Sequence, residues 1–135
     1  MSYPIEEIEG IGPAFGEKLK TAGVKNTDNL LKACATPAGR KDLAEKSGIS
    51  YDNLLKWANR ADLMRINGVG KQFSELLENA GVDTVKELAT RRADNLSAKM
   101  AEINAVKKLT RVVPKQEMVQ EWIDKAKTMD AIITH

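Results

Sequence analysis

The sequence predicts an all-α protein in which two similar helical units pack as one compact body. One stretch of the chain recurs at a constant interval, which indicates an internal repeat. Apolar residues in both copies recur at the three- and four-residue intervals of a helix, whereas the two-residue alternation of a strand persists nowhere. A chain of 135 residues that is 42% hydrophobic and 30% charged can bury an ordinary core as one domain or as two tightly joined halves.

The repeat defines a first copy, residues 1–58, and a second copy, residues 59–135, which we expect to fold as two tandem repeats. Each copy has room for about four to five short helices. Ten identical residues lie 58 positions apart in the two copies. They are Ile8, Gly10, Gly12, Phe15, Glu17, Leu19, Ala22, Gly23, Val24 and Leu30 in the first copy, and Ile66, Gly68, Gly70, Phe73, Glu75, Leu77, Ala80, Gly81, Val82 and Leu88 in the second.

The match resumes near the end of each copy after a change of spacing. Leu54 and Trp57 correspond to Val119 and Trp122 only if the second copy carries about seven extra residues, which we place within residues 96–108. The two tryptophans occupy matching positions on apolar helical faces, and aromatic residues make up only 4% of the chain. We therefore expect both tryptophans in the core rather than stacked on nucleic-acid bases.

The first long helix of each copy has a recognisable start and end. Phe15, Leu19 and Ala22 are spaced to share one helical face, as are the equivalent residues of the second copy. Pro13 suits the first turn of such a helix, where its missing N–H costs no hydrogen bond. Gly23 falls where a left-handed C-cap ends the helix, and Gly81 does so in the second copy.

Further helices follow in each copy. The next pair begins at Asn26 and Thr84. Thr84 and Glu87 have the spacing of a capping box, in which the hydroxyl and the carboxylate each bind a backbone amide. The remaining expected helices cover residues 38–46, 51–59 and 115–129.

Two glycine-rich segments, residues 8–12 and 66–70, each join a short helix that begins near Pro4 or Asp62 to the helix that follows. In each segment an apolar residue stands between two glycines. The glycines can adopt backbone angles that other residues cannot, and the apolar side chain between them can enter the core. This pattern resembles the hairpin of the helix-hairpin-helix family. The resemblance implies contact with the nucleic-acid backbone without reading of sequence, in some members with a bound monovalent cation, and no other cofactor is expected.

The two hairpins differ in charge. A hairpin of this kind leaves amides exposed at a helix N-terminus, where the dipole favours an anion such as phosphate. The second hairpin has Arg65 before it, Lys71 after it and the uncharged Asn67 in place of Glu9, so we expect it to be the better phosphate site. A purely structural role remains open, because any tight crossing of two helices needs such glycines. The rim of the first hairpin holds Glu6, Glu7, Glu9 and Glu17, with Lys18 and Lys20 further on.

The net charge of +2 is too small to indicate a nucleic-acid binder by itself. The basic residues of the second copy nevertheless form local clusters. These clusters either extend a basic strip that adds salt-sensitive affinity for a backbone, or they are ordinary solvated helix faces. They comprise Arg91 and Arg92, then Lys107, Lys108, Arg111 and Lys115.

The sequence indicates no enzyme, and we expect no catalytic residue and no metal site. It contains no Walker-type phosphate loop, no nucleophile elbow and no zinc-protease motif. Cys34 is the only cysteine, and the only histidine is the last residue, His135. The apolar runs are far shorter than the roughly 20 residues that span a bilayer. The first residues lack the features of a signal peptide, so we expect a cytoplasmic protein with no membrane partner.

Four stretches, residues 9–13, 35–41, 59–65 and 112–114, carry a likeness that covers nearly the full length. On these stretches the chain resembles a bacterial family of uncharacterised proteins built from a duplicated helix-hairpin-helix unit. The resemblance implies the fold, two tandem helix-hairpin-helix repeats. DNA binding comes only from the wider superfamily, since the role of the family itself is unassigned.

The leading hypothesis is a non-catalytic module that binds the DNA or RNA backbone weakly through the second hairpin. The rival hypothesis is a protein-interaction or scaffold module, in which the hairpins only turn corners and an exposed apolar groove between the copies receives a partner helix. An accessory domain of a larger nucleic-acid enzyme is compatible with the same residues. The expected nucleic-acid contacts are Gly68, Val69, Gly70, Lys71, Arg65, Lys107, Lys108 and Arg111, with Gly10, Ile11, Gly12 and Lys18 secondary.

Overall fold

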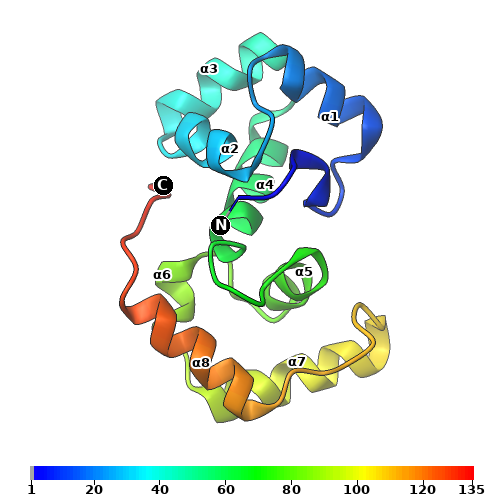
Figure 1. Ribbon diagram of the computed structural model, residues 1–135, viewed down its shortest axis with the longest axis vertical. Coiled ribbons are helices and arrows are strands. Elements are labelled where there is room, and N and C mark those ends of the chain that lie inside the picture. The colour runs from blue at the N-terminus through cyan, green and yellow to red at the C-terminus, as the bar shows by residue number, and fades with distance from the viewer. Residues whose placement is uncertain (1) are drawn as a thin grey trace.

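The computed structural model describes residues 2–135, which fold into eight α-helices and one short 3-10 helix, η1 (Figure 1). No strand occurs in this range, although Pro4 and Asn26 form a single bridging pair. The prediction of an all-α fold is confirmed. The elements are η1 (Ile5–Glu7), α1 (Gly12–Thr21), α2 (Thr27–Cys34), α3 (Pro37–Ser47), α4 (Tyr51–Leu63), α5 (Lys71–Asn79), α6 (Val85–Leu88), α7 (Ala93–Lys107) and α8 (Gln116–Lys127).

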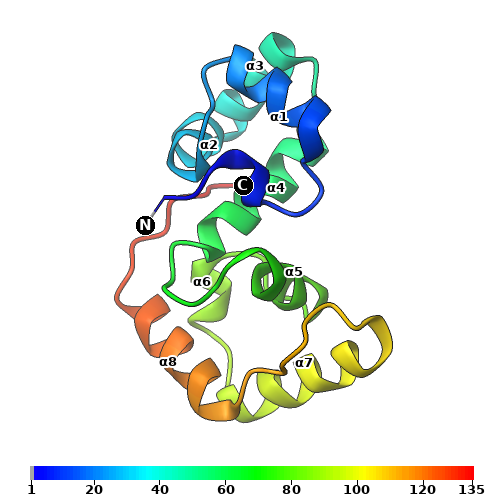
Figure 2. The same ribbon diagram turned by 45° about the vertical axis from the view of Figure 1, so that its right-hand side comes forward.

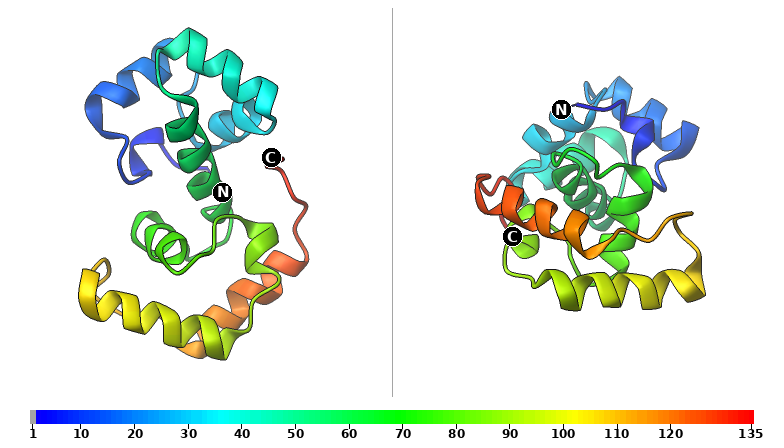
Figure 3. Two further views of the ribbon diagram at one scale, coloured as in Figure 1. Left: turned by 180° about the vertical axis from the view of Figure 1, so that it is seen from behind. Right: turned by 60° about the horizontal axis from the view of Figure 1, so that its bottom comes forward.

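Two hydrophobic cores share α4. The first core is formed by η1, α1, α2, α3 and most of α4, and the second is formed by α5 to α8. Figure 3 shows α7 and α8 next to each other at the end of the molecule far from α1 and α3. Trp57 and Ala58 of α4 are buried in the first core, whereas Leu63, at the end of the same helix, is buried in the second. The boundary expected between residues 58 and 59 therefore falls inside α4.

Side chains cap four of the helices at their N-termini. In each case an oxygen accepts a hydrogen bond from the amide three residues further on, at 2.8 to 3.2 Å. The capping box expected at Thr84 is only half formed. Its hydroxyl binds the amide of Glu87, but the carboxylate of Glu87 accepts instead from Arg91, at 3.0 Å. The capping residues are Asn26 for α2, Thr36 for α3, Ser50 for α4 and Thr84 for α6.

The expected glycine C-caps are confirmed. Gly23 and Gly81 follow α1 and α5 with φ of 89° and 91°, in the left-handed region. The amides of Val24 and Val82 donate to carbonyls five residues back, at 2.8 and 2.9 Å. These bonds satisfy the ends of the two helices and turn the buried valines onto them.

Two helices, α4 and α7, depart from the expectation. α4 runs to Leu63 rather than ending near residue 59, so the short helix expected to begin near Asp62 is instead its last turn. The helix continues to Leu63 because no glycine or proline interrupts it. Ala61 and Leu63, in its last turn, are buried and add packing contacts that stabilise it. α7 was not expected as a helix, because only extra residues were placed within residues 96–108; it has 15 residues against 11 in α3. Even so, no helix within residues 2–135 has the length and apolar character needed to cross a membrane.

The two copies bury their aromatic residues in the same way. The rings of Phe15 and Trp57 are 5.2 Å apart between centroids, and those of Phe73 and Trp122 are 5.3 Å apart. Both tryptophans are only 3% exposed. The prediction that they belong to the cores is confirmed, and base stacking on either ring is excluded in this conformation.

The C-terminal segment returns from α8 to the first core (Figures 1 and 2). Ile133 is buried there, and the amide of Thr134 donates to the carbonyl of Ala35 at 2.8 Å. Arg40, which is 1% exposed, donates to the carbonyl of Thr134 at 2.7 Å. Its other hydrogen bonds go to a second backbone carbonyl and to the Tyr51 hydroxyl. The segment thus supplies one hydrogen-bond acceptor for the buried guanidinium of Arg40 and one apolar side chain, Ile133, to the first core.

Candidate nucleic-acid interface

The second hairpin is a tight turn closed by its central valine. Gly68 has a φ of 91°, a left-handed conformation that glycine adopts without strain. Val69 is fully buried in the second core, and its amide donates to the carbonyl of Ile66 at 3.0 Å. Gly70 is extended and directly precedes α5, which starts at Lys71. The expectation that the residue between the glycines enters the core is confirmed.

The first hairpin has the same construction with one difference. Gly10 has a φ of 96°, and Ile11 is 1% exposed with its amide donating to the carbonyl of Ile8 at 3.3 Å. Its second glycine, Gly12, has a φ of 62° and is the first residue of α1, whereas Gly70 is not left-handed. Buried Ile11 and Val69 therefore anchor the hairpins, and neither side chain is available to a ligand.

The helices that follow the hairpins, α1 and α5, begin without a side-chain cap. The first amides of an α-helix have no partner within the helix. At α5, no side chain of the described residues accepts from them. These amides and the positive end of the helix dipole together favour an approaching anion.

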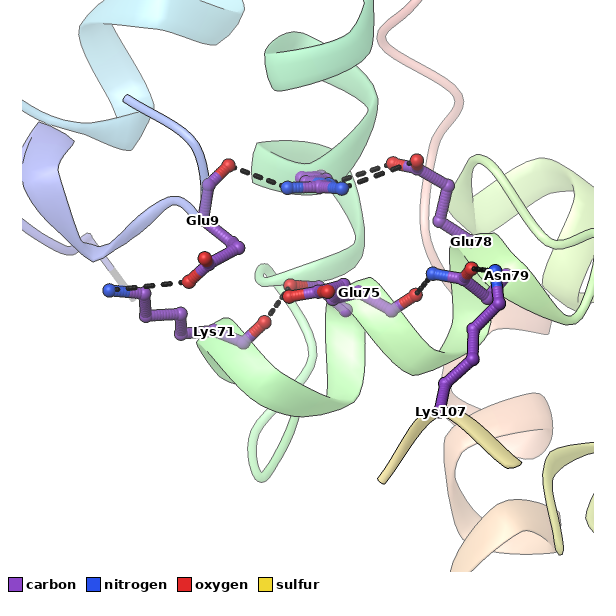
Figure 4. Close-up of polar contacts among 8 residues, drawn as sticks. Glu9, Lys71, Glu75, Glu78, Asn79 and Lys107 are labelled. Atoms are coloured by element: carbon purple, nitrogen blue, oxygen red, sulfur yellow. Dashed lines mark hydrogen bonds and ion pairs between the residues drawn. The ribbon is translucent and has the colours of Figure 1, made fainter. Parts of the chain in front are cut away.

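Lys71 pairs with the first hairpin. Its Nζ lies 3.4 Å from Oε2 of Glu9, and both side chains are 45% exposed. The two hairpins are therefore close enough for the acidic residue of one to compensate the basic residue of the other (Figure 4). Sequence reasoning assigned these two residues to separate sites and did not bring them together.

Arg65 is bound to the protein itself. Its Nη1 donates to Oδ1 of Asp62 at 2.7 Å and to the carbonyl of Asp130 at 3.0 Å. Asp62 is 1% exposed, and its other oxygen accepts from the amide of Val85, the first residue of α6, at 2.8 Å. Arg65 therefore compensates a buried carboxylate that holds the start of a helix, and its side chain is only 17% exposed.

Arg60 is a residue that sequence reasoning missed. Its Nη1 donates to the carbonyl of Glu9 at 2.5 Å, and its Nε donates to Oε2 of Glu78 on α5 at 2.7 Å. The side chain is only 6% exposed. Arg60 thus ties the first hairpin to α5 through α4, and it lies in one of the stretches, residues 59–65, that carried the family resemblance.

Lys107, another expected cation, lies at the other end of α5. Lys107 donates to Oδ1 of Asn79 at 2.5 Å, whereas Lys71 is at the start of that helix, about 12 Å away along its axis at about 1.5 Å per residue. Figure 4 shows Glu75 between these two ends. Lys71 and Lys107 are therefore separated by the length of α5 and do not form one continuous basic strip along it. Lys108, at φ 52°, and Arg111 are exposed in the loop that follows α7.

Charges around the first hairpin are partly compensated. Lys20 donates a hydrogen bond to Glu6, and this contact lowers the pKa of Glu6 and raises the pKa of Lys20. Glu7 and Glu17 are exposed and form no ion pair within residues 2–135. Lys18 lies over the ring of Phe15, with its Nζ 5.7 Å from the centroid. The rim of this hairpin remains acidic.

An apolar hollow of about 380 Å³ lies where α8 begins. The sequence predicted an apolar groove between the two copies, but this hollow belongs to the second copy alone. Val112 beside it is 68% exposed and Met118 is 41% exposed. The surface lies where residues 108–115, which connect α7 to α8, meet the start of α8.

Cys34 is a packing residue of the first core. It is fully buried, and burial raises the pKa of its thiol to about 11. The thiol therefore stays protonated at neutral pH and is a poor nucleophile. Elsewhere in the described chain, no three His, Cys, Asp or Glu side chains are arranged to hold a metal ion.

Comparison with known proteins identifies the family. No curated protein and no solved structure matches the chain. Residues 9–129 match the family described as Domain of unknown function (DUF4332). This match covers the glycines of both hairpins and every helix from α1 to α8. The chain therefore belongs to the DUF4332 family, whose function is uncharacterised.

Proposed function

We propose that the chain consists of two tandem helix-hairpin-helix repeats, and that the second repeat binds the nucleic-acid backbone weakly and without reading its sequence. The repeats correspond to residues 1–58 and 59–135, with α4 shared between them. The matching hairpins, glycine C-caps and Phe–Trp pairs of the two copies support this architecture. Hairpins of this kind expose backbone amides at a helix start, which suits a phosphate.

The difference between the two hairpins carries the proposal. In the second, Gly68 is exposed, α5 begins without a side-chain cap, and Lys71 is the first residue of that helix. In the first, Pro13 stands at the position of Lys71, and Glu9 stands at the position of Asn67. An anion therefore meets free amides, a helix dipole and a lysine together only at the second hairpin.

The contact between Lys71 and Glu9 is compatible with this role. An exposed ion pair contributes about 0–1 kcal/mol, so a phosphate that also binds the amides of α5 can displace the carboxylate. The few available phosphate contacts imply weak binding that falls with salt. Within this proposal Arg65 positions the hairpin rather than touching the ligand, because Asp62 and the Asp130 carbonyl already hold it.

Fluorescence anisotropy with labelled DNA and RNA of about 20 nucleotides, at low and near-physiological salt, tests the proposal. Lys71→Glu is expected to lower the affinity at low salt about tenfold or more. Lys41→Glu is the matched control, because this lysine of α3 is exposed, has no ion pair in the described chain and changes the net charge equally. The proposal fails if wild type does not bind, or if the two variants bind equally well.

A protein-interaction role is the second candidate, and the apolar hollow beside Val112 and Met118 favours it. The apolar face of a partner helix is the occupant that fits such a surface. This role predicts a complex that persists at high salt and is lost in Met118→Glu. Lys71→Glu is expected to leave that complex unchanged, which separates the two candidates.

A further inference from the structure

Arg91 and Arg92 stand between two open hollows on the second repeat. The hollow on one side, about 410 Å³, is also lined by Lys99 of α7. The hollow on the other side, about 360 Å³, is also lined by Lys127 of α8 and by Asp94. Four cations and one carboxylate thus line adjoining hollows, in a chain whose net charge is only +2.

Three of these cations are available to a ligand. Lys99 and Lys127 are exposed and form no ion pair with any residue from 2 to 135. Arg92 is 74% exposed and pairs with Asp94 at 2.9 Å. An exposed pair of this kind is weak, so an arriving phosphate can take the place of the carboxylate.

Arg91 is already fixed in position. Its Nε donates to Oε1 of Glu87 at 3.0 Å, and its Nη2 donates to the carbonyl of Gly81 at 2.8 Å. Its Nη1 makes no hydrogen bond within the described part of the chain. A guanidinium held in this way loses little conformational entropy when it binds a phosphate.

The fold of the repeat does not require an arginine at the start of this helix. In the first repeat the residue before α3 is Thr36, and its hydroxyl caps the helix. In the second repeat the residue before α7 is Arg92, and its side chain caps nothing. The second repeat therefore has an exposed positive charge where the first repeat has a helix cap. Binding of a ligand explains this arginine better than helix stability does.

We infer that Arg91, Arg92, Lys99 and Lys127, the arginine-pair surface, bind consecutive phosphates of a nucleic-acid backbone. This inference rests on the proposed function and adds a second contact to that of the second hairpin. Two hollows that share the arginines suit a linear phosphodiester, because successive phosphates can occupy them in turn. The amide side chains of Asn95 and Gln116 line the same hollows and can donate to phosphate oxygens.

The test is the salt dependence of DNA binding by the double variant Lys99→Ala/Lys127→Ala, measured by anisotropy with single-stranded and duplex DNA of about 20 nucleotides. These lysines lie in different hollows and have no ion pair in the described residues, so the fold is expected to survive their removal. The matched control is Lys32→Ala/Lys41→Ala, which removes two exposed, unpaired lysines of the first repeat. Circular dichroism is expected to place both melting temperatures within about 2 °C of wild type.

If the arginine-pair surface binds phosphates, the Lys99→Ala/Lys127→Ala variant is expected to lose about tenfold or more in affinity at low salt. The slope of log affinity against log salt is expected to fall by about 2 in magnitude. The control pair is expected to change both quantities much less. If the Lys99/Lys127 variant binds like its control while Lys71→Glu weakens binding, the inference is overturned and the proposed function stands. If wild type does not bind nucleic acid even at low salt, both are overturned.

Discussion

Nζ of Lys71 lies 3.4 Å from Oε2 of Glu9, so the first residue of α5 faces a carboxylate of the other hairpin. This contact links the first hairpin, which contains Glu9, to the start of α5 directly after the second hairpin (Figure 4). The positive charge of Lys71, on which the proposed function depends, is therefore partly compensated by the first hairpin.

Under the proposed function, Glu9→Gln is expected to strengthen nucleic-acid binding severalfold at low salt. The change removes a competitor for Lys71 and also a negative charge near the bound phosphate. Anisotropy titration measures the effect. Glu45→Gln, an exposed carboxylate of α3 without an ion pair in the described chain, is the control for net charge. Equal affinities for the two variants would contradict a role for the Glu9–Lys71 contact.

Arg60→Met is expected to lower the free energy of unfolding by about 2 kcal/mol or more. The substitution leaves the Glu9 carbonyl and the partly buried Glu78 carboxylate without their guanidinium. Urea denaturation measures the loss. A double-mutant cycle with Glu78→Gln isolates the pair, and a coupling energy near zero would show that the ion pair with Glu78 contributes nothing to stability.

Ile133→Ala is expected to lower the free energy of unfolding by about 2 kcal/mol, because the side chain fills part of the first core from the far end of the chain. The control is Val106→Ala, whose side chain is 81% exposed, with an expected change below about 0.5 kcal/mol. The Ile133 side chain would prove unimportant for stability if both variants unfolded at the same urea concentration as wild type.

The stability of the protein is expected to fall between about pH 9 and about pH 11 because of Cys34. Burial raises the pKa of its thiol from the ordinary value of 9.0 to about 11, so in this window the unfolded thiol loses its proton while the folded thiol keeps it. The free energy of unfolding is therefore highest below this window. Urea titrations across the window are expected to show a shallower decline for Cys34→Ala than for wild type. Parallel declines would mean that other groups cause the whole effect.

Local signals in the sequence predicted most of the secondary structure. Asn26 caps α2 and the glycines at 23 and 81 end their helices as expected, because each of these features depends on hydrogen bonds within a few residues. The length of α4 and the presence of α7 were not predicted. A helix can continue beyond its apolar stripe when a second core receives its last residues, as Leu63 does here.

By itself, the sequence determined the all-α fold, the two glycine hairpins and the burial of Ile11 and Val69, since helical periodicity and glycine backbone freedom act over short spans. Only the tertiary structure decided which basic side chains are free. Arg65 is held by Asp62 and by a carbonyl of the C-terminal segment, and Lys71 faces Glu9. The contacts of Arg65 with the C-terminal segment and of Lys71 with Glu9 form between segments that are distant in the sequence. The spacing of residues along one helix cannot predict such contacts.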